Sequence, residues 1–162
     1  MTFRAAMGLL PTGVTVVTVN SGEQTEAVTA SSVTSISLDP LLVMISIGAE
    51  GRTQRAIERH GSFTVNVMSR EQEPLARAFA SRRRPAGTRA QRELGAAVGL
   101  TGNVLVDDAV LAIDCRTELR YPGGDHVILL GRVEAVHTAP AQHGPLVYHR
   151  GAYAGLDLEA VT

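Results

Sequence analysis

Hydroxyl side chains gather between Ala27 and Val43, in the stretch AVTASSVTSISLDPLLV. Six of them fall within nine residues, at Thr29, Ser31, Ser32, Thr34, Ser35 and Ser37. Because each hydroxyl can both donate and accept a hydrogen bond, such a row can follow the polar edge of a flat ligand. Serine and threonine also favour ordinary turns, where they bond to nearby backbone groups. The composition of the stretch leaves both interpretations open.

His126 is a second residue that could do chemistry, because it follows the turn signal Gly123-Gly124 and begins an apolar run. Imidazole exchanges protons near neutral pH, so a histidine beside a bound substrate can supply a proton or a hydrogen bond. The alternative is a turn histidine paired with Asp125. No metal-ligand spacing links Cys115 with the other histidines, so we expect no metal site. Those histidines are His60, His137, His143 and His149.

The stretch Gly51-Arg52-Thr53 is a candidate anion site. Residues Thr53 to His60 predict a short helix that ends at Gly61, a residue that tolerates left-handed geometry. The free amides and the dipole at a helix start attract anions. Arg52 adds a positive charge there, and Thr53 adds a hydroxyl.

A second cationic stretch runs from Arg82 to Arg92, where Pro85 and Gly87 interrupt the sequence. This composition predicts a mobile surface loop, with a phosphate or dinucleotide contact as the alternative. The stretch carries five arginines, at Arg82, Arg83, Arg84, Arg89 and Arg92.

The overall composition indicates a globular protein without a nucleic-acid or membrane partner. Of the 162 residues, 44% are hydrophobic but only 4% are aromatic, so we expect an aliphatic core. The formal net charge of −1 gives no general field for nucleic acid or anionic lipid. A single cysteine excludes an internal disulfide and fits a reducing compartment. No apolar run approaches the roughly 20 residues of a membrane span, and no secretion signal begins the chain, so we expect a cytoplasmic protein.

Strands dominate the elements that must position these side chains. After Leu111 the alternation of apolar and polar residues predicts a half-buried strand, with Cys115 on the buried face and Asp114 on the exposed face. The turn signal Asn20-Ser21-Gly22 predicts a hairpin between the first two long strands. The strand ranges are Gly13–Asn20, a partner leading into Ala27, Leu41–Gly48, Ser62–Met68, Leu111–Tyr121, Val127–Ala135 and a short strand within GPLVYHRGAY.

The predicted helices are short. Thr2 can cap a first helix that carries Phe3, Met7 and Leu10 on one face. Ser69 and Gln72 form a capping box before a later helix. We expect the buried stripe of that helix to contain Leu75, Ala78 and Phe79.

About seven strands with hairpins argue against a parallel sheet built from βαβ units. No GxGxxG sequence follows a strand, and no Walker A sequence is present, so a nucleotide would not be held in either of these ways. A β-barrel with peripheral helices is the simplest architecture, because closure removes exposed strand edges. We see no domain boundary and no repeat, and we therefore expect residues 1–162 to form one domain.

Five motifs in this order resemble the flavin reductase-like, FMN-binding split-barrel family over nearly the whole chain, from Phe3 to Leu156. They are PTGVTVVTV, AVTASSVTSISLDPLLV, GRTQRAIERHGSFTVNVM, GDHVILLGRVEAV and PLVYHRGAY. The resemblance implies a mainly β, Greek-key-like split barrel with peripheral helices. It also implies a homodimeric flavin oxidoreductase that takes NADH or NADPH as hydride donor and FMN or FAD as acceptor. Many members supply reduced flavin to a separate monooxygenase.

The resemblance also assigns roles to particular residues. It places Thr29, Ala30, Ser31 and Ser32 along the isoalloxazine ring, with Ser35 near the ribityl chain or the phosphate. It places Arg52 and Thr53 at the phosphate, and His126 beside the flavin and the nicotinamide. The protein would mainly bind and orient, because the hydride chemistry belongs to the cofactors.

The chain departs from the family in two places. Pro40-Leu41 replaces a common double proline, and the stretch from Arg82 to Gly99 lacks the family's usual Asp-Arg-Phe element. The second departure leaves open which flavin is used and whether it is a bound cofactor or a diffusible substrate. Two alternatives also stay open: a flavin-dependent oxidoreductase with its own organic substrate, and a non-catalytic flavin-binding module.

Overall fold

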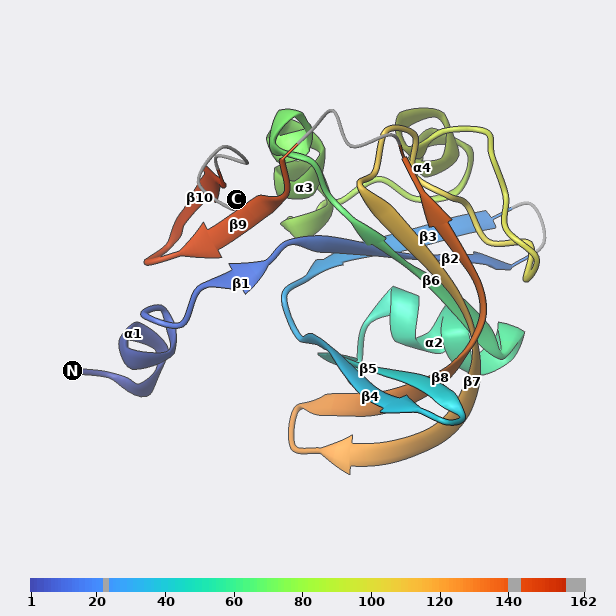
Figure 1. Cartoon of the computed structure of the whole chain (residues 1–162), viewed down its shortest axis with the longest axis horizontal. Helices are drawn as coiled ribbons and strands as arrows, with labels where there is room; N and C mark the ends of the chain where they lie inside the picture. The colour runs from blue at the N-terminus through green and yellow to red at the C-terminus, as the bar shows by residue number, and fades with distance from the viewer. Residues whose placement is uncertain (22–23, 140–143, 157–162) are drawn as a thin grey trace.

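A seven-stranded antiparallel sheet forms the body of the protein (Figure 1). The computed structural model describes residues 1–21, 24–139 and 144–156, so Gly22 of the predicted turn and His143 lie outside the described residues. The strand order is β3-β2-β6-β7-β8-β5-β4, in which β2–β6 and β5–β8 are neighbours from distant parts of the chain. The strands are β2 (Thr15–Ser21), β3 (Gln24–Ala30), β4 (Val33–Leu38), β5 (Leu41–Gly48), β6 (Ser62–Val67), β7 (Leu111–Gly123) and β8 (His126–Thr138).

The two edges of this sheet, β3 and β4, are separated in sequence only by Ser31 and Ser32. The sheet therefore curls, and Figure 1 shows β2 and β3 on one side and β4 and β5 on the other, with a helix between them. The predicted mainly β architecture with short peripheral helices is confirmed. Closure of the sheet, which we expected to remove its edges, does not occur between β3 and β4. The open edge is compatible with a split barrel.

An inner core lies where helix α2 (Arg52–His60) enters the curled sheet. The helix contributes Ala56 and Ile57, and both are buried against strand residues such as Phe63. Gly61 ends α2 with a φ of 72°, as its sequence position predicted. The sequence prediction of this helix was short by one residue, because α2 begins at Arg52.

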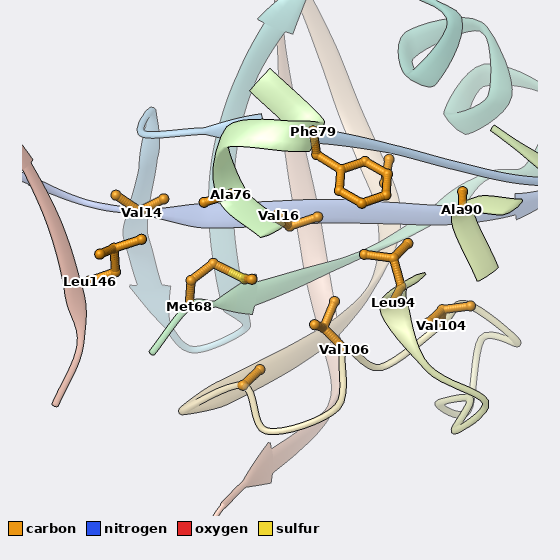
Figure 2. Close-up of a cluster of buried hydrophobic side chains, with 12 residues drawn as sticks. Val14, Val16, Met68, Ala76, Phe79, Ala90, Leu94, Val104, Val106 and Leu146 are labelled. Atoms are coloured by element: carbon orange, nitrogen blue, oxygen red, sulfur yellow. The ribbon is translucent and has the colours of Figure 1, made fainter. Parts of the chain in front are cut away.

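A second core packs helices α3 (Glu73–Ala80) and α4 (Gly87–Leu94) on the other face of β2 (Figure 2). Figure 2 shows Phe79 lying over Val16, with Leu94 approaching from α4. The buried residues of α3 are Ala76 and Phe79, whereas Leu75 and Ala78 are only partly buried, so the predicted stripe was correct in part.

The sequence analysis predicted that the arginine-rich stretch from Arg82 to Arg92 is a loop, and this prediction was wrong for its second half. The second half of the stretch forms α4. Ala90 and Leu94 are four residues apart, so they lie on one face of this helix and pack into the second core. Arg89 pairs with Glu93 on the exposed side of the helix. Only the residues before Gly87 connect the two helices.

Two short helices and a small three-stranded sheet lie beside the main sheet. Helix α1 (Phe3–Met7) is capped by Thr2, whose hydroxyl accepts a hydrogen bond from the Ala5 amide. The 3₁₀ helix η1 (Arg70–Gln72) carries the predicted capping box of Ser69 and Gln72 and leads into α3. A small sheet contains β1 (Thr12–Gly13), β9 (Leu146–His149) and β10 (Ala152–Gly155).

Asp114 is fully buried, although the alternation after Leu111 predicted it on the exposed face. Asp114 and Cys115 pair with successive residues of β6 and therefore point to opposite faces of β7, as the alternation predicted. Both faces are covered at this point, because Cys115 packs with Phe63 in the inner core and Asp114 lies under the segment that follows α4. The carboxylate accepts hydrogen bonds from Thr64 Oγ1 at 2.7 Å, from the Thr101 amide at 2.9 Å and from Thr101 Oγ1. These bonds attach the segment that follows α4 to the sheet.

Within the part of the chain that the structure describes, no helix is both long enough and apolar enough to cross a membrane.

Candidate functional site

The free edge of β3 carries backbone groups that no neighbouring strand uses. The Ala27 carbonyl oxygen accepts a hydrogen bond from Arg84 Nε at 2.8 Å, so Ala27 faces away from β2. Alternate residues of an antiparallel strand share one direction, which places the N–H and C=O of Thr29 on the same free side. The Ala30 carbonyl instead accepts from Thr15 Oγ1 on β2, at 2.7 Å. Among the residues that the structure describes, none accepts a hydrogen bond from the Thr29 amide, so this donor is available beside Ser31.

A pocket of about 400 Å³ lies beside this edge, between β3, α3 and the β9–β10 hairpin. Thr29, Ala30 and Ser31 line it together, so the structure gathers three of the predicted flavin residues. Ser31 is exposed, while the Thr29 hydroxyl donates to the Ala76 carbonyl oxygen at 2.7 Å. Thr29 can therefore offer its backbone more readily than its hydroxyl.

The opposite wall of this pocket is aromatic and cationic. Tyr148 and Tyr153 meet edge to face with their ring centroids 5.1 Å apart, and the Arg77 guanidinium lies 4.6 Å from the centroid of Tyr153. Burial raises the pKa of Tyr153 from its usual value, and the positive charge of Arg77 opposes that rise. The sequence analysis did not single out these three residues as part of a site. It interpreted YHRGAY, which contains both tyrosines, only as part of a short strand and a turn.

Ser32 and Ser35 lie in different surroundings. Ser32 joins the end of β5, since its carbonyl accepts from the Ser46 amide at 3.1 Å and its hydroxyl donates to the Ser46 carbonyl. Ser35 is exposed on β4 and pairs with Val43. Val43 lies five residues before Gly48 along β5, about 16 Å from the strand end that leads to α2. The register therefore separates Ser35 from Arg52 and Thr53, and the predicted phosphate contacts do not converge on one point.

A cluster of two arginines and one glutamate lies at the N-terminus of α2. We call Glu26, Arg52, Thr53 and Arg84 the arginine cluster. Arg52 Nε lies 3.4 Å from Glu26 Oε2, and Arg52 Nη2 donates to the Arg84 carbonyl oxygen at 3.1 Å. Arg84 Nη2 donates to Thr53 Oγ1 at 3.5 Å. The buried Thr53 hydroxyl therefore orients Arg84.

The arginine cluster has an excess of positive charge in partly buried surroundings. Burial lowers the pKa of Arg84 from its usual value, the nearby charge of Arg52 lowers it further, and Glu26 opposes both. Two guanidinium groups thus share one carboxylate. A hollow of about 140 Å³ adjoins Arg84 and is lined by Gly51, Thr53 and the buried Gln54. Two cations beside one carboxylate can attract an anion, because an anion reduces the repulsion between them.

His126 begins β8 and pairs with Gly48, the last residue of β5. Gly48 lines the hollow at the arginine cluster, so the backbone of His126 is one strand spacing away, about 4.8 Å. Its side chain lies on the opposite strand face from the buried Val127 and is 49% exposed. His126 Nδ1 lies 2.8 Å from Asp125 Oδ1, which lowers the pKa of Asp125 through the hydrogen bond and the charge of His126. His126 Nε2 is the ring nitrogen left for another partner.

Among the described residues, no group of three or more His, Cys, Asp or Glu side chains could hold a metal ion. Cys115, which the sequence placed in the core, is a free and fully buried thiol.

The chain belongs to the flavin reductase-like domain family, whose model matches residues 7–157. The NADH-dependent FMN reductase AsuE2 of Streptomyces nodosus subsp. asukaensis is 61% identical over 154 residues, which cover 95% of this chain and 83% of that protein. The resemblance that the five motifs indicated is confirmed.

Two solved structures have the same fold. The Streptomyces globisporus C-1027 NADH:FAD oxidoreductase SgcE6, in complex with NAD and FAD fragments, aligns with a TM-score of 0.87 at 33% identity. The alignment covers 97% of this chain and 92% of that one. BorF, the flavin reductase component of a bacterial two-component tryptophan halogenase, aligns with a TM-score of 0.86 at 34% identity, covering 94% of this chain and 95% of that one.

Proposed function

We propose that this chain is an NADH-dependent FMN reductase that passes reduced flavin to a separate flavin-dependent monooxygenase. The observation that carries this proposal is the 61% identity to an NADH-dependent FMN reductase across 95% of the chain. When both cofactors are bound, they supply the chemistry, a hydride transfer from nicotinamide C4 to flavin N5. The chain's own residues bind the two molecules and orient them.

The free edge of β3 fits the polar rim of an isoalloxazine ring. The Thr29 backbone amide points away from β2, and Ser31 adds an exposed hydroxyl in the same pocket. Ala30 lies between them, and its small side chain lets a planar ring approach the strand. Ser32 then anchors the turn through both of its bonds to Ser46. We assign the ring to this edge, with the ribityl chain leading from it towards the arginine cluster and away from Ser35, which the register of β4 and β5 separates from that cluster.

The arginine cluster fits the flavin phosphate. Arg52 and Arg84 supply two positive charges against the single carboxylate of Glu26, and the α2 amides begin beside Thr53. Thr53 acts here chiefly by holding Arg84, since its hydroxyl is buried. Arg84 thus joins Arg52 as a phosphate ligand in this proposal.

His126 would orient the nicotinamide from the other side of the arginine cluster. Asp125 holds Nδ1, so Nε2 can donate to or accept from a bound dinucleotide. Its half-exposed position suits a contact with a substrate that enters and leaves at every turnover.

A homodimer is part of the proposal. Two apolar surfaces are exposed: Phe3, Met7 and Leu10 around α1, and Ile36, Leu38 and Leu41 on β4 and β5. Leu38 is 84% exposed and Phe3 is 82% exposed, which is unusual for side chains that gather in patches. A second copy of the chain would cover them. We also propose one domain over residues 1–162 and a cytoplasmic location, in keeping with the free thiol of Cys115.

The decisive experiment measures oxidation of NADH and of NADPH by the purified protein, with FMN and with FAD, through the loss of nicotinamide absorbance. Rapid oxidation that saturates with added FMN supports the proposal, and the four pairings rank the cofactors. A rate no higher than the flavin-only blank, in a protein that binds FMN, contradicts it and leaves a non-catalytic flavin-binding module.

A further inference from the structure

A second pocket, of about 660 Å³, continues the pocket beside β3 towards the N-terminus. The two pockets share Ser31, Tyr148 and Gly151, so they form one groove, which we call the tyrosine groove. The proposed flavin edge ends at Ser31. The far half of the groove lies beyond that edge. Neither the proposed position of the flavin ring nor that of the phosphate, at the arginine cluster, occupies this half.

Two arginines line the far half of the tyrosine groove, and the residues that line it include no aspartate or glutamate. Arg4 comes from α1 and Arg150 from the β9–β10 turn. Within the described ranges, neither guanidinium is paired with a carboxylate. The Arg150 amide donates to the Gly8 carbonyl oxygen at 2.7 Å, which joins the turn to the end of α1. The fold thus brings two unpaired cations from opposite ends of the chain to one groove.

Arg150 occupies a backbone conformation that does not suit arginine. It has a φ of 51° and Gly151 has a φ of 80°, as in a two-residue turn with both central residues left-handed. Asparagine, aspartate and glycine are the residues that favour such turns. Arginine is therefore an unusual residue at this turn position, and its side chain lines a groove without acidic residues, which makes it a candidate ligand-binding residue.

The middle of the groove is a flat aromatic surface. Tyr148 is 37% exposed and lines both pockets, and the edge-to-face contact with Tyr153 fixes its ring. Arg77 covers Tyr153 from α3 and pairs with Glu73, so it stiffens this wall. A rigid, partly exposed ring next to two free guanidinium groups suits a ligand with a planar base and a diphosphate.

We infer that the tyrosine groove binds the adenosine diphosphate portion of a dinucleotide, with the adenine on Tyr148 and the diphosphate between Arg4 and Arg150. This inference rests on the proposed function for the identity of the dinucleotide. Both NADH and FAD carry this portion, whereas FMN lacks it. With FMN as acceptor, the portion belongs to NADH.

Direct titration with adenosine 5′-diphosphate tests the site without turnover. Binding to the full chain, weakened about tenfold by Arg150→Asn or Arg4→Gln, is the expected result. Arg150→Asn suits the left-handed turn, so its melting temperature should equal or exceed that of the parent protein. Tyr148→Ala should weaken binding while Tyr148→Phe keeps it. Arg59→Gln, at an exposed arginine at the end of α2, is the matched control.

Steady-state kinetics then identify the source. If NADH uses the groove, Arg150→Asn raises KM for NADH about tenfold with FMN as acceptor and leaves KM for FMN unchanged. If FAD uses it, the same variant raises KM for FAD and leaves KM for FMN and NADH unchanged. Absence of ADP binding, or equal binding by the groove variants and Arg59→Gln, overturns the inference. Inactivity towards every flavin, with ADP binding intact, counts against the proposed function instead.

Discussion

Arg84 and Arg52 lie next to each other although both side chains are positively charged. The Ala27 carbonyl, the Thr53 hydroxyl and the Glu26 carboxylate hold them there. Keeping two guanidinium groups beside one carboxylate costs free energy in partly buried surroundings, and a bound phosphate would offset that cost. The arginine cluster is therefore the part of the proposed site that depends most on its ligand.

Replacing Arg84 with glutamine should weaken FMN binding. We expect KM for FMN to rise roughly tenfold, about 1.4 kcal/mol, with kcat nearly unchanged, because the contact is made equally in the bound and reacting states. The measurement is the flavin dependence of NADH oxidation. Arg83→Gln is the matched control, since Arg83 is the exposed neighbour. Equal effects of the two substitutions would rule out a special role for Arg84.

The buried thiol of Cys115 leads to a prediction about how stability and thiol reactivity depend on pH. Burial, followed by the charges of Asp114 and Glu134, raises the pKa of this thiol from 9.0 to about 12. As the pH rises, the thiol of the unfolded chain therefore loses its proton before the thiol of the folded chain. The free energy of unfolding is unaffected by the ionisation of this group below pH 9 and decreases between pH 9 and about 12. The thiol should react slowly with a disulfide reagent at pH 8 in the native state and quickly in urea. A Cys115→Ser variant is the blank for the reaction.

The sequence identified some site residues because their signals are local. Arg52 and Thr53 stand at a helix start, and the hydroxyl row is visible as composition. Arg84 could not be chosen from three successive arginines, since its role comes from a contact with Ala27, 57 residues away. Tyr148 likewise gained significance only when the hairpin brought it to Ser31.

At the scale of elements, the polar contacts of Asp114 hold the segment after α4 against the sheet. Asn103 extends this network, since its amide nitrogen donates to Ser62 Oγ at 3.0 Å and to Thr101 Oγ1 at 2.8 Å. Gly99 also packs tightly, because an added Cβ would lie 2.5 Å from Asp114 Oδ2. The segment has little regular structure of its own and depends on these bonds for its position.

An Asp114→Asn substitution should destabilise the protein by about 1–3 kcal/mol, because the new amide would direct a donor at groups that are already donors. Urea unfolding with and without the substitution measures the change. Asp108→Asn is the control, since Asp108 is exposed and its φ of 59° suits asparagine. A loss of stability in the control as large as that of Asp114→Asn would show that the network is not the cause.

Elements with a regular pattern were predictable, and irregular ones were not. The hairpin of β7 and β8, the α2 helix and the capping box follow from periodicity and local capping signals. The segment that covers the outer face of β7 leaves no signal in an alternating sequence, so Asp114 was expected to be exposed although it is buried. The α4 helix was not predicted, because its glycine and arginines are typical of a surface loop. Ala90 and Leu94 nevertheless have the spacing of a buried helix face.

At the scale of the whole molecule, the exposed apolar surfaces around α1 and on β4 are the observation that supports the proposed dimer. The proposed dimer would cover them, and it would lie close to the groove because Met7 and Leu10 line its far half. Assembly and nucleotide binding would then be coupled.

Light scattering should give twice the mass of one chain at micromolar concentration, and Leu38→Asp or Phe3→Asp should shift the protein towards the single chain. Both residues are exposed in the single chain, so the fold itself should tolerate the change. Leu100→Asp is the matched control, because Leu100 is 74% exposed on another part of the surface. A monomer before any substitution would contradict the dimer.

The open edges of β3 and β4 have a practical consequence for the purified protein. Unpaired strand edges are templates on which other chains can add strands, so they promote aggregation. A flavin lying along the Thr29 edge would mask that template while it is bound. If FMN binds there as proposed, we expect flavin-free preparations to aggregate faster on storage than preparations that contain added FMN.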